Sequence, residues 1–392
     1  MLKGNDIICF AGEDWWYHNP HSNLHIMKSL AKENRILFVN SIGTRMPDFK
    51  NDKFVWKKIF SKIKSILKFL KKAEKNIYVF SPIALPPIEK FEEFARAFNK
   101  FFLHIQFKLI FFLLNIKKPI LWVSIPTANE IVFYINSKKA KCMVYYCVDN
   151  ISHYSNTFSE IVLRSEIELH KRADVAFFVN HQLVDERKIY NSNTHYLSHG
   201  ADFDHFFKAH EIYDKIPSDL DSMPSPIVAY IGEIRYLDFN LVEFLANRHK
   251  EISFVFIGSV HSDIERFKSM PNVYFLGKKR YEDLPLYMQK VACYAIYYER
   301  NSVFNNYRNP KKLLEYLATG KPIISVPLLE LKYFPDLVYI AENYELFDQC
   351  LKEALESDSL VKKNNRIRYA KEHTWDMVGK EVSKHIMDVL SK

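Results

Sequence analysis

Residues 309–326, NPKKLLEYLATGKPIISV, predict a short helix followed by a buried strand. Asn at the N-cap, Pro at the first helical position and Gly just past the end delimit the helix, and residues 323–326 form the apolar strand. Lys311 and Lys312 stand in the first turn, where the helix dipole disfavours positive charge. We therefore expect an anion to bind at this helix start. The alternative is that both lysines are solvated and that Glu315 pairs with them along the helix.

The rest of the chain alternates short apolar runs with helical segments, in two successive series of similar size. Such alternation is typical of parallel strands joined by crossover helices, so we expect an α/β fold with two doubly wound, Rossmann-like domains. Strands are expected at residues 7–11, 35–40, 76–81, 119–125, 142–149, 175–180, 195–198, 227–231, 252–257, 273–276, 293–298, 323–326 and 338–340.

The predicted domains follow from this alternation and from one proline-rich break. An N-terminal domain spans residues 1–205, and a linker with three prolines spans 206–226. A C-terminal domain spans 227–373, and a last helix occupies 374–392.

The composition argues for a packed protein without a structural metal. Of 392 residues 48% are hydrophobic, and the five cysteines show no CxxC or Cys/His spacing. The first residues lead directly into a strand-like run without a signal-peptide pattern, which favours a cytoplasmic location. The oily stretch 98–116 contains Lys100, His104 and Lys108, and is too interrupted to span a bilayer.

Positive charge is concentrated in residues 50–75, where ten lysines stand against Asp52 and Glu74, so that ten minus two gives +8 of the chain's net +9. On a helical wheel the apolar residues of this segment share one face, which is typical of a helix lying at an anionic membrane surface. The alternative is a helix packed on its own domain with a solvated lysine face, and a nucleic-acid site is disfavoured because the aromatic residues lie on the apolar stripe. The membrane-facing residues are expected to be Trp56, Lys57, Lys58, Phe60, Lys64 and Lys68.

Glycines mark a second feature of the C-terminal half. The chain has only nine, and Gly232, Gly258 and Gly277 each follow a predicted strand. Ligands of open α/β sheets bind at the carboxyl ends of strands, where a residue without Cβ lets phosphate or sugar approach the backbone. Neither GxGxxG nor a Walker A sequence is present. The glycines therefore outline a ligand site of another kind.

In their order, YIGEI (230–234), FVFIG (254–258), NVYFLG (272–277), residues 309–322, and Tyr369-Ala370 with Thr374-Trp375 resemble the landmarks of bacterial GT-B glycosyltransferases that build capsule, O-antigen or other exopolysaccharide. The resemblance covers the C-terminal half well and the N-terminal half loosely. It implies two Rossmann-like domains facing a cleft, with an activated sugar's nucleotide on the C-terminal one, and a last helix that returns to the N-terminal domain.

Carried over residue by residue, the resemblance implies a donor site. Glu315 matches the carboxylate that binds the ribose, and Lys312 matches the cation that faces the diphosphate. Tyr307 stands where many relatives have the first glutamate of a Glu-x7-Glu pattern, which argues against the retaining mechanism. The remaining donor residues are expected to be Gly232 and Arg235 by the phosphates, Gly277, Lys278 and Arg280 near the base, and Gly258 and Asn309.

The chemistry of sugar transfer also predicts residues on the acceptor side of the site. A cationic helix start can stabilise a leaving diphosphate without a metal, so no metal or other cofactor is expected. An inverting transfer needs a general base, and our candidate is Asp149 at the end of an apolar strand; the alternative is a turn or N-cap aspartate. Asp14, His18 and His21, after the first strand, are expected to line the acceptor side.

These features predict a cytoplasmic glycosyltransferase, peripheral at the inner face of the cell membrane. It would move a hexose from a nucleotide-diphospho sugar, with UDP favoured over GDP, to a lipid-linked saccharide. Two alternatives stay open, namely a nucleotide-sugar epimerase of the same fold and a catalytically lapsed, membrane-bound sugar-nucleotide-binding protein.

Overall fold

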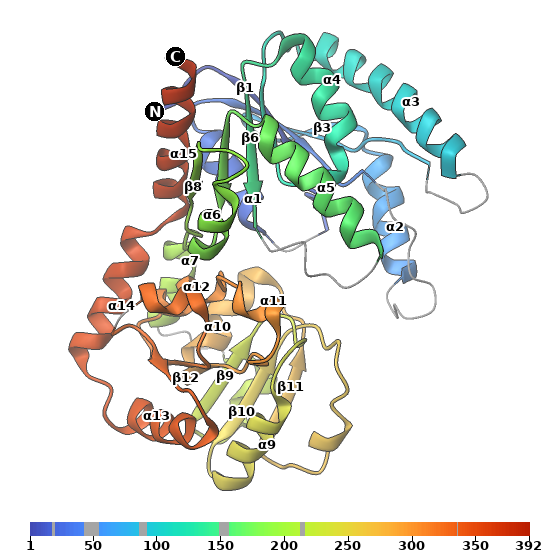
Figure 1. Cartoon of the computed structure of the whole chain (residues 1–392). Helices are drawn as coiled ribbons and strands as arrows, with labels where there is room; N and C mark the ends of the chain where they lie inside the picture. The colour runs from blue at the N-terminus through green and yellow to red at the C-terminus, as the bar shows by residue number, and fades with distance from the viewer. Residues whose placement is uncertain (18–19, 43–54, 86–91, 149–156, 212–215, 335) are drawn as a thin grey trace. The chain divides into compact units, whose positions relative to one another are not determined.

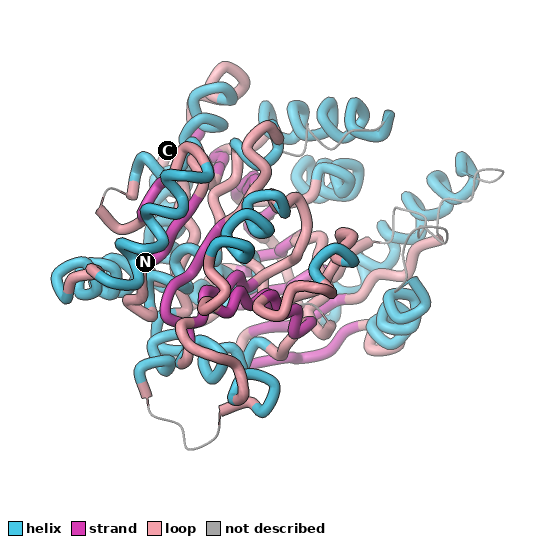
Figure 2. Tube along the Cα trace, turned by 90° about the horizontal axis from the view of Figure 1, so that it is seen from below, coloured by secondary structure: helices cyan, strands magenta, loops and turns pink. Residues whose placement is uncertain are grey.

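The computed structural model describes residues 1–17, 20–42, 55–85, 92–148, 157–211, 216–334 and 336–392. They divide into two compact units. Unit 1 comprises Met1–Val179, Leu183–Leu197 and Val378–Lys392, and unit 2 comprises Asn180–Gln182 and Ser198–Met377. In both units helices flank a central sheet (Figures 1 and 2). The predicted α/β architecture with two doubly wound sheets is confirmed.

Unit 1 contains an eight-stranded sheet in the order β3-β4-β2-β1-β5-β6-β7-β8. All neighbouring strands are parallel except β3 and β4, which are antiparallel. Its elements are β1 (Asp6–Phe10), α1 (Ser22–Leu30), β2 (Arg35–Val39), α2 (Val55–Ile66), β3 (Leu70–Glu74), β4 (Ile77–Phe80), α3 (Glu92–Leu113), β5 (Ile120–Val123), α4 (Asn129–Lys139), β6 (Cys142–Cys147), α5 (Thr157–Arg172), β7 (Val175–Phe178), α6 (His181–Arg187), β8 (Thr194–Tyr196) and most of α15 (Trp375–Leu390).

Unit 2 contains a six-stranded parallel sheet in the order β11-β10-β9-β12-β13-β14. Helices α9 and α13 lie on one of its faces, and α10 and α12 lie on the other (Figure 1). Its elements are α7 (Phe203–Phe207), α8 (Ser218–Asp221), β9 (Ile227–Ile231), α9 (Phe239–Arg248), β10 (Ser253–Ile257), β11 (Val273–Gly277), α10 (Leu284–Gln289), β12 (Val291–Ile296), α11 (Val303–Asn306), α12 (Lys312–Ala318), β13 (Ile323–Ser325), β14 (Tyr339–Ile340), α13 (Tyr344–Glu356) and α14 (Leu360–Glu372).

The strand order of unit 2 changes direction between β9 and β12. From β9 the chain moves outward through β10 to β11, and then returns to place β12 on the other side of β9. Ligands of open α/β sheets bind at such a point, beyond the carboxyl ends of the strands. The loops after β9 and β12 are therefore where a site is expected.

The unit boundaries differ in detail from those expected from the sequence. We expected the N-terminal domain to end at 205 and residues 206–226 to form a linker, whereas the continuous part of unit 2 runs from Ser198 to Met377 and includes this segment. Phe206 and Leu220 are fully buried in the core of unit 2, which explains why the proline-rich stretch packs as part of it. The chain ends in α15, and Val378–Lys392 belong to unit 1, as a returning C-terminal helix requires.

One prediction for unit 1 is wrong. The helical wheel drawn for the lysine-rich segment continued through Leu70 and Lys72, but α2 ends at Ile66 and residues Leu70–Glu74 form the edge strand β3. Phe69, with a φ of 38°, lies at the reversal between helix and strand. Lys71 and Lys72 are exposed on this strand. Lysines on an edge strand hinder pairing with other chains, which gives them a structural role.

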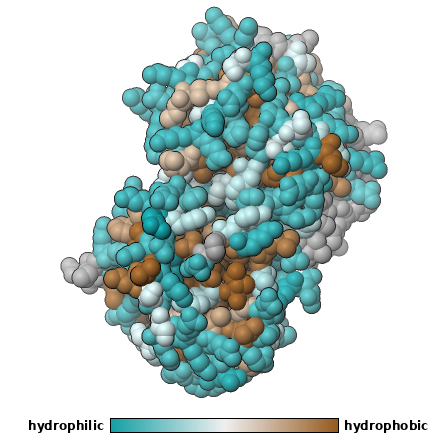
Figure 3. All heavy atoms as spheres, turned by 60° about the vertical axis from the view of Figure 1, so that its left-hand side comes forward, coloured by the Kyte–Doolittle hydropathy of each residue, from teal (hydrophilic) through white to brown (hydrophobic). Residues whose placement is uncertain are grey.

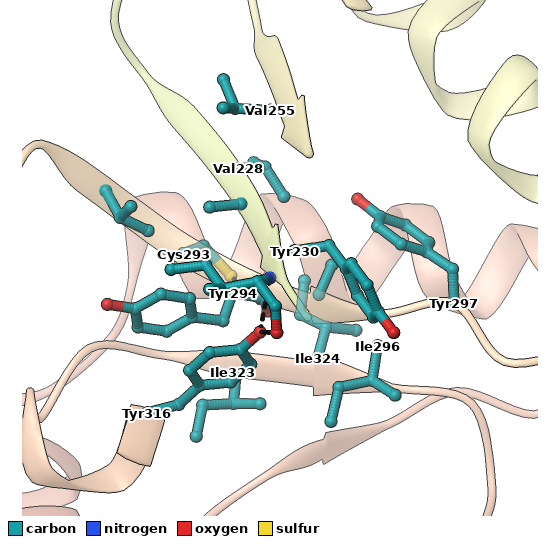
Figure 4. Packing of buried hydrophobic residues seen from close by; sticks show 14 of the residues in the cluster. Val228, Tyr230, Val255, Cys293, Tyr294, Ile296, Tyr297, Tyr316, Ile323 and Ile324 are labelled. Atoms are coloured by element: carbon teal, nitrogen blue, oxygen red, sulfur yellow. Dashed lines mark hydrogen bonds between the residues drawn. The ribbon is translucent and has the colours of Figure 1, made fainter. Parts of the chain in front are cut away.

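Buried tyrosines hold α12 against the sheet of unit 2. The rings of Tyr294 on β12 and Tyr316 on α12 stack with centroids 4.0 Å apart, and both residues are fully buried (Figure 4). The Tyr316 hydroxyl accepts a hydrogen bond from the backbone N–H of Ile231 at 2.7 Å and donates one to the carbonyl of the same residue at 3.1 Å. These contacts fix α12 at the carboxyl end of β9.

Candidate functional site

Lys312, the first residue of α12, lies over the end of β9. It is one helical turn before Tyr316, so the contacts of Tyr316 direct both side chains toward the same strand. Gly232 follows β9 with a φ of 146°, and a Cβ built on it would overlap the Lys312 ammonium and come within 2.9 Å of Cε. Glycine at position 232 therefore makes room for the lysine.

Gly232, Gly258 and Gly277 lie next to one another at the carboxyl ends of three neighbouring strands. The N–H of Gly232 donates to the carbonyl of Ile257 at 2.8 Å, and the N–H of Gly258 donates to the carbonyl of Gly277 at 3.0 Å. A Cβ on Gly258, whose φ is 155°, would overlap the carbonyl oxygen of Gly232. The structure thus brings together the three glycines that the sequence singled out.

Lys312 is surrounded by aromatic rings and a second cation. Its ammonium lies 3.7 Å from the ring centroid of Tyr230 and 5.5 Å from that of Tyr298. The Arg308 guanidinium lies 4.6 Å from the rings of both Tyr298 and Phe304. Arg308, Tyr230 and Tyr298 were not predicted from the sequence as site residues, although Arg308 directly precedes residues 309–326. Tyr298 places Lys312 and Arg308 in one electrostatic neighbourhood.

The pKa values in this neighbourhood show that positive charge gathers there. Burial lowers the pKa of Lys312, and Arg308 lowers it further. Burial alone would raise the pKa of the Tyr298 hydroxyl, but Lys312 and Arg308 lower it overall. Among the described residues, neither cation forms an ion pair with a carboxylate within 4.0 Å. Two cations without carboxylate partners at a partly buried point favour the binding of an anion. The alternative of a solvated Lys312 is therefore wrong.

Glu315 belongs to a second group on the same helix. It forms an ion pair with Lys311 at 3.1 Å, and not with Lys312. Burial, followed by the charges of Glu315 and Asp202, raises the pKa of Tyr281, whose hydroxyl donates to Asp202 at 3.0 Å. The Glu315 side chain is 12% exposed, so its carboxylate is held close to the protein yet open to a ligand.

His199, which was not predicted from the sequence as a site residue, lies near Lys311 and Asn309. It is 5% exposed, and its ring is hydrogen-bonded to the backbone of Asn309. Burial, followed by the charge of Lys311, lowers the pKa of His199 to about 3, so the ring is neutral near neutral pH. The Asn309 N-cap prediction is wrong, because α12 begins at Lys312 after Lys311, whose side chain makes no capping hydrogen bond.

The other predicted donor residues are less closely assembled. Arg235 is exposed and lies 5.4 Å from the ring of Tyr236, and Lys278 is exposed after β11. Arg280 is 76% exposed and lies 3.4 Å from Glu282. In the described part of the chain, none of these three side chains forms an ion pair or cation–π contact with Lys312 or Glu315. Their roles stay predictions.

A cavity of about 720 Å³ lies near this edge of the sheet, and none of the predicted donor residues lines it. Three of its residues are acidic and one is basic, so its charge disfavours a diphosphate. It is lined by Asp238, Asn240, Glu299, Arg300, Asn301, Ser302, Asn343, Tyr344 and Glu345.

Two Asp-x-Asp triplets, of a kind that can hold a metal, lie in unit 2 at residues 202–204 and 219–221. Asp219 is bound by Lys279 at 2.5 Å and by the Tyr287 hydroxyl at 3.0 Å. Asp221 lies 3.3 Å from Lys290. Protein donors therefore occupy the carboxylates of Asp219 and Asp221, and the Tyr281 hydroxyl donates to Asp202.

The acceptor-side predictions fall in unit 1. Asp149 and His18 lie outside the described residues. Asp14 is 8% exposed and accepts hydrogen bonds from the Ser65 hydroxyl at 2.5 Å and the Trp16 N–H at 3.0 Å. His21 is exposed at the start of α1. Asp14 thus has a structural role, because it helps to position α2.

The predicted membrane residues are on or just after α2. Phe60 is 61% exposed and Lys64 is exposed, which a surface contact requires. The Lys68 ammonium lies 4.2 Å from the Trp16 ring and 4.9 Å from the Tyr17 ring, so it is partly engaged within unit 1. The side chains of Trp56, Lys57 and Lys58 lie outside the described part of the structure.

The known proteins to which this chain is similar include glycosyltransferases. No protein-family model matches it. A Bacillus subtilis (strain 168) protein, provisionally named as the teichuronic acid biosynthesis glycosyltransferase TuaH, is 23% identical over 265 residues, which are 62% of this chain and 66% of that protein. The match thus spans just under two thirds of the relative's length.

Solved structures extend the likeness over the whole chain. Sucrose-phosphate synthase of Thermosynechococcus elongatus superposes with a TM-score of 0.67 at 11% identity, over 99% of both chains. A trehalose-phosphate synthase of Burkholderia vietnamiensis gives 0.65 at 10%, over 100% of both. HepE of Anabaena, solved with UDP and glucose, gives 0.61 at 12%, over 99% of this chain and 100% of that one. The chain therefore has the GT-B fold, and its resemblance to bacterial GT-B glycosyltransferases is confirmed.

Proposed function

We propose that this chain of GT-B fold is a glycosyltransferase that moves a hexose from a nucleotide-diphospho sugar to an acceptor in the synthesis of a bacterial surface polysaccharide. The observation that carries the proposal is a pair of cations without carboxylate partners among the described residues: Lys312, which lies beside Gly232, and Arg308, which shares the Tyr298 ring with it. The related protein of Bacillus subtilis and the solved GT-B structures support the reaction class.

The donor is expected to bind along the carboxyl ends of β9 to β11. Lys312 and Arg308 would contact the diphosphate, and Glu315 would exchange its ion pair with Lys311 for the two ribose hydroxyls. Lys278 and Arg280 follow β11 on the side where the base would lie. UDP is favoured over GDP, and the UDP bound in HepE supports that choice.

The reaction we propose is a single displacement. The bond between the sugar C1 and the diphosphate oxygen breaks, and its electron pair leaves with the nucleoside diphosphate, whose charge Lys312 and Arg308 neutralise. An acceptor hydroxyl forms the new bond at C1 with inversion, and its proton passes to a base. Asp149 stays our candidate for that base, and we expect no metal. Asp14, His18 and His21 stay candidates for the acceptor side.

The acceptor we propose is a saccharide on a lipid carrier, which brings the enzyme to the inner face of the cell membrane. No helix in the described part of the chain is long and apolar enough to span a bilayer. Attachment would be peripheral, through segment 50–75, where Phe60 and Lys64 are exposed.

Titration calorimetry with UDP, GDP and their hexose conjugates tests the donor site. The wild type should bind a uridine nucleotide, and the double variant Lys312→Ala/Glu315→Ala should not. Equal binding by both proteins, or no nucleotide binding by either, contradicts the proposal.

Product analysis separates the enzymatic alternatives. Incubation of a bound nucleotide sugar without acceptor should leave the sugar unchanged; formation of its epimer would instead identify an epimerase. Incubation with lipid-linked saccharides should release nucleoside diphosphate, and binding without turnover over a broad acceptor panel would favour a lapsed enzyme.

A further inference from the structure

Helix α3 of unit 1 exposes an apolar stripe along its length. At ~100° per residue the six stripe residues fall within an arc of about 80°. The opposite side of the helix is also apolar, because Leu103, Phe107 and Ile110 are buried against the rest of unit 1. An ordinary surface helix turns polar side chains outward, so this face needs a partner. The stripe comprises Phe94, Phe98, Phe101, Ile105, Leu109 and Phe112, which are 37–82% exposed.

Helix α2 also exposes apolar side chains on its outer side. Ser65 is fully buried and donates to Asp14, and the Lys62 ammonium donates to the carbonyl of Ser41. On the outside, Phe60, Ile63 and Leu67 are 61%, 47% and 79% exposed. The inner side of α2 thus makes polar contacts, while its outer side exposes these apolar side chains together with Lys64.

The charges around the α3 stripe indicate what covers it. From Phe94 to Lys118 the chain carries five basic residues and no acidic one. Lys100, Lys108, Lys117 and Lys118 are all exposed. Two copies of this stripe would bring like charges together, whereas an anionic lipid surface would pair with them. A lysine close to such a surface strengthens partitioning about fivefold.

We propose that α3, together with the outer face of α2, docks into the headgroup region of an anionic membrane with its axis along the surface. The phenylalanines of the stripe enter the acyl boundary, and the lysines contact lipid phosphates. This inference rests on the membrane attachment in the proposed function and extends it, because α3 lies outside segment 50–75. The face drawn in Figure 3 is mainly hydrophilic and also carries apolar patches.

The test is co-sedimentation of the full chain with phosphatidylglycerol-containing vesicles and with pure phosphatidylcholine vesicles. The variant Phe101→Ser/Phe112→Ser removes two stripe residues that are 66% and 82% exposed, and its vesicle partitioning should fall at least about tenfold. The matched control Ile189→Ser/Leu360→Ser, at sites 79% and 70% exposed, should bind like the wild type. Binding should also weaken with added salt and in pure phosphatidylcholine.

Three results would overturn the inference, and they differ from a failure of the proposed function. If the α3 variant binds vesicles like the wild type and Lys64→Glu loses binding, then α2 alone attaches the protein to the membrane. A wild-type dimer that the α3 variant converts to monomer, with vesicle binding unchanged, makes the stripe an interface between copies. No vesicle binding by the wild type removes membrane attachment altogether, while nucleotide binding by that sample leaves the donor site standing.

A second readout does not depend on removing apolar residues. In the variant Phe112→Trp, brominated lipids should quench more fluorescence than in the wild type, because the new indole enters the acyl boundary. Equal quenching in both proteins would contradict the docking geometry.

Discussion

Replacing Lys312 by methionine is expected to weaken UDP binding about 10- to 150-fold while leaving the protein as stable as before. A hydrogen bond from a charged donor contributes about 1.5–3 kcal/mol, and each 1.4 kcal/mol is a factor of ten in affinity. Methionine keeps the length of the side chain over Gly232 and the Tyr230 ring but removes the charge. Burial lowers the pKa of Lys312, so the folded protein holds this cation at a cost, and the variant should melt at the wild-type temperature or above it.

Calorimetry with UDP and a thermal melt of the same samples measure both effects. Lys371→Met removes an exposed lysine from α14 and is the matched control, which should bind UDP like the wild type. Wild-type affinity in Lys312→Met would refute the reasoning. A fall in affinity together with a fall in melting temperature would also refute it, because the lysine would then be structural.

The pH dependence of UDP binding tests the same role of the Lys312 ammonium. Since burial and Arg308 lower the pKa of Lys312, its ammonium loses the proton at a lower pH than an exposed lysine does. Affinity for UDP should therefore decline with rising pH before the ordinary lysine pKa of 10.5 is reached. Lys312→Arg keeps the charge at all these pH values and should flatten the profile; a wild-type profile as flat as that of the variant would count against a role for the ammonium.

Three further predictions concern the scaffold of the site. Tyr316→Phe leaves the backbone groups of Ile231 without their partner, so the free energy of unfolding should fall by about 1–3 kcal/mol in chemical denaturation; an unchanged midpoint would deny the hydroxyl that role. Gly258→Ala places a Cβ against the carbonyl of Gly232 at a φ that favours glycine, and should lower the melting temperature more than a surface substitution does, a result to be checked by calorimetry. His199 has a folded pKa of about 3 against 6.5 when unfolded, so its contribution is present above pH 6.5 and is lost as the pH falls toward 3, by up to about 5 kcal/mol; His199→Gln should show a flatter stability profile, and an equally steep one would contradict this.

The architecture of both units was predictable because parallel strands buried on both faces leave continuous apolar runs in the sequence. All thirteen expected strands are present, within a residue or two at each end. β3 was missed because Leu-Lys-Lys-Ala-Glu fits the wheel of the preceding helix, and only the reversal at Phe69 shows where the helix ends. The 206–226 segment was misjudged because its prolines obscured the buried Phe206 and Leu220.

The candidate site was predictable in its backbone and less so in its side chains. Gly232 and Gly258 were identified because a glycine directly after a buried strand indicates that another group approaches the backbone closely there. Lys312 was identified because of its place before the Leu-Leu-Glu run. Arg308 and Tyr298 were missed because they come together only through stacking between different loops, which leaves no spacing in the sequence. The apolar face of α2 was expected at a surface from its helical wheel, whereas the contact that sets its buried side joins Ser65 to Asp14, residues far apart in the chain, and leaves no local pattern.

The central claim is that Lys312 and Arg308 bind the diphosphate of a sugar nucleotide. A crystal structure of the protein with UDP tests it most directly. We predict that a phosphate oxygen lies within hydrogen-bond distance of the Lys312 ammonium, with the ribose hydroxyls on Glu315. A diphosphate bound elsewhere, for example in the cavity lined by Asp238 and Tyr344, would contradict the claim.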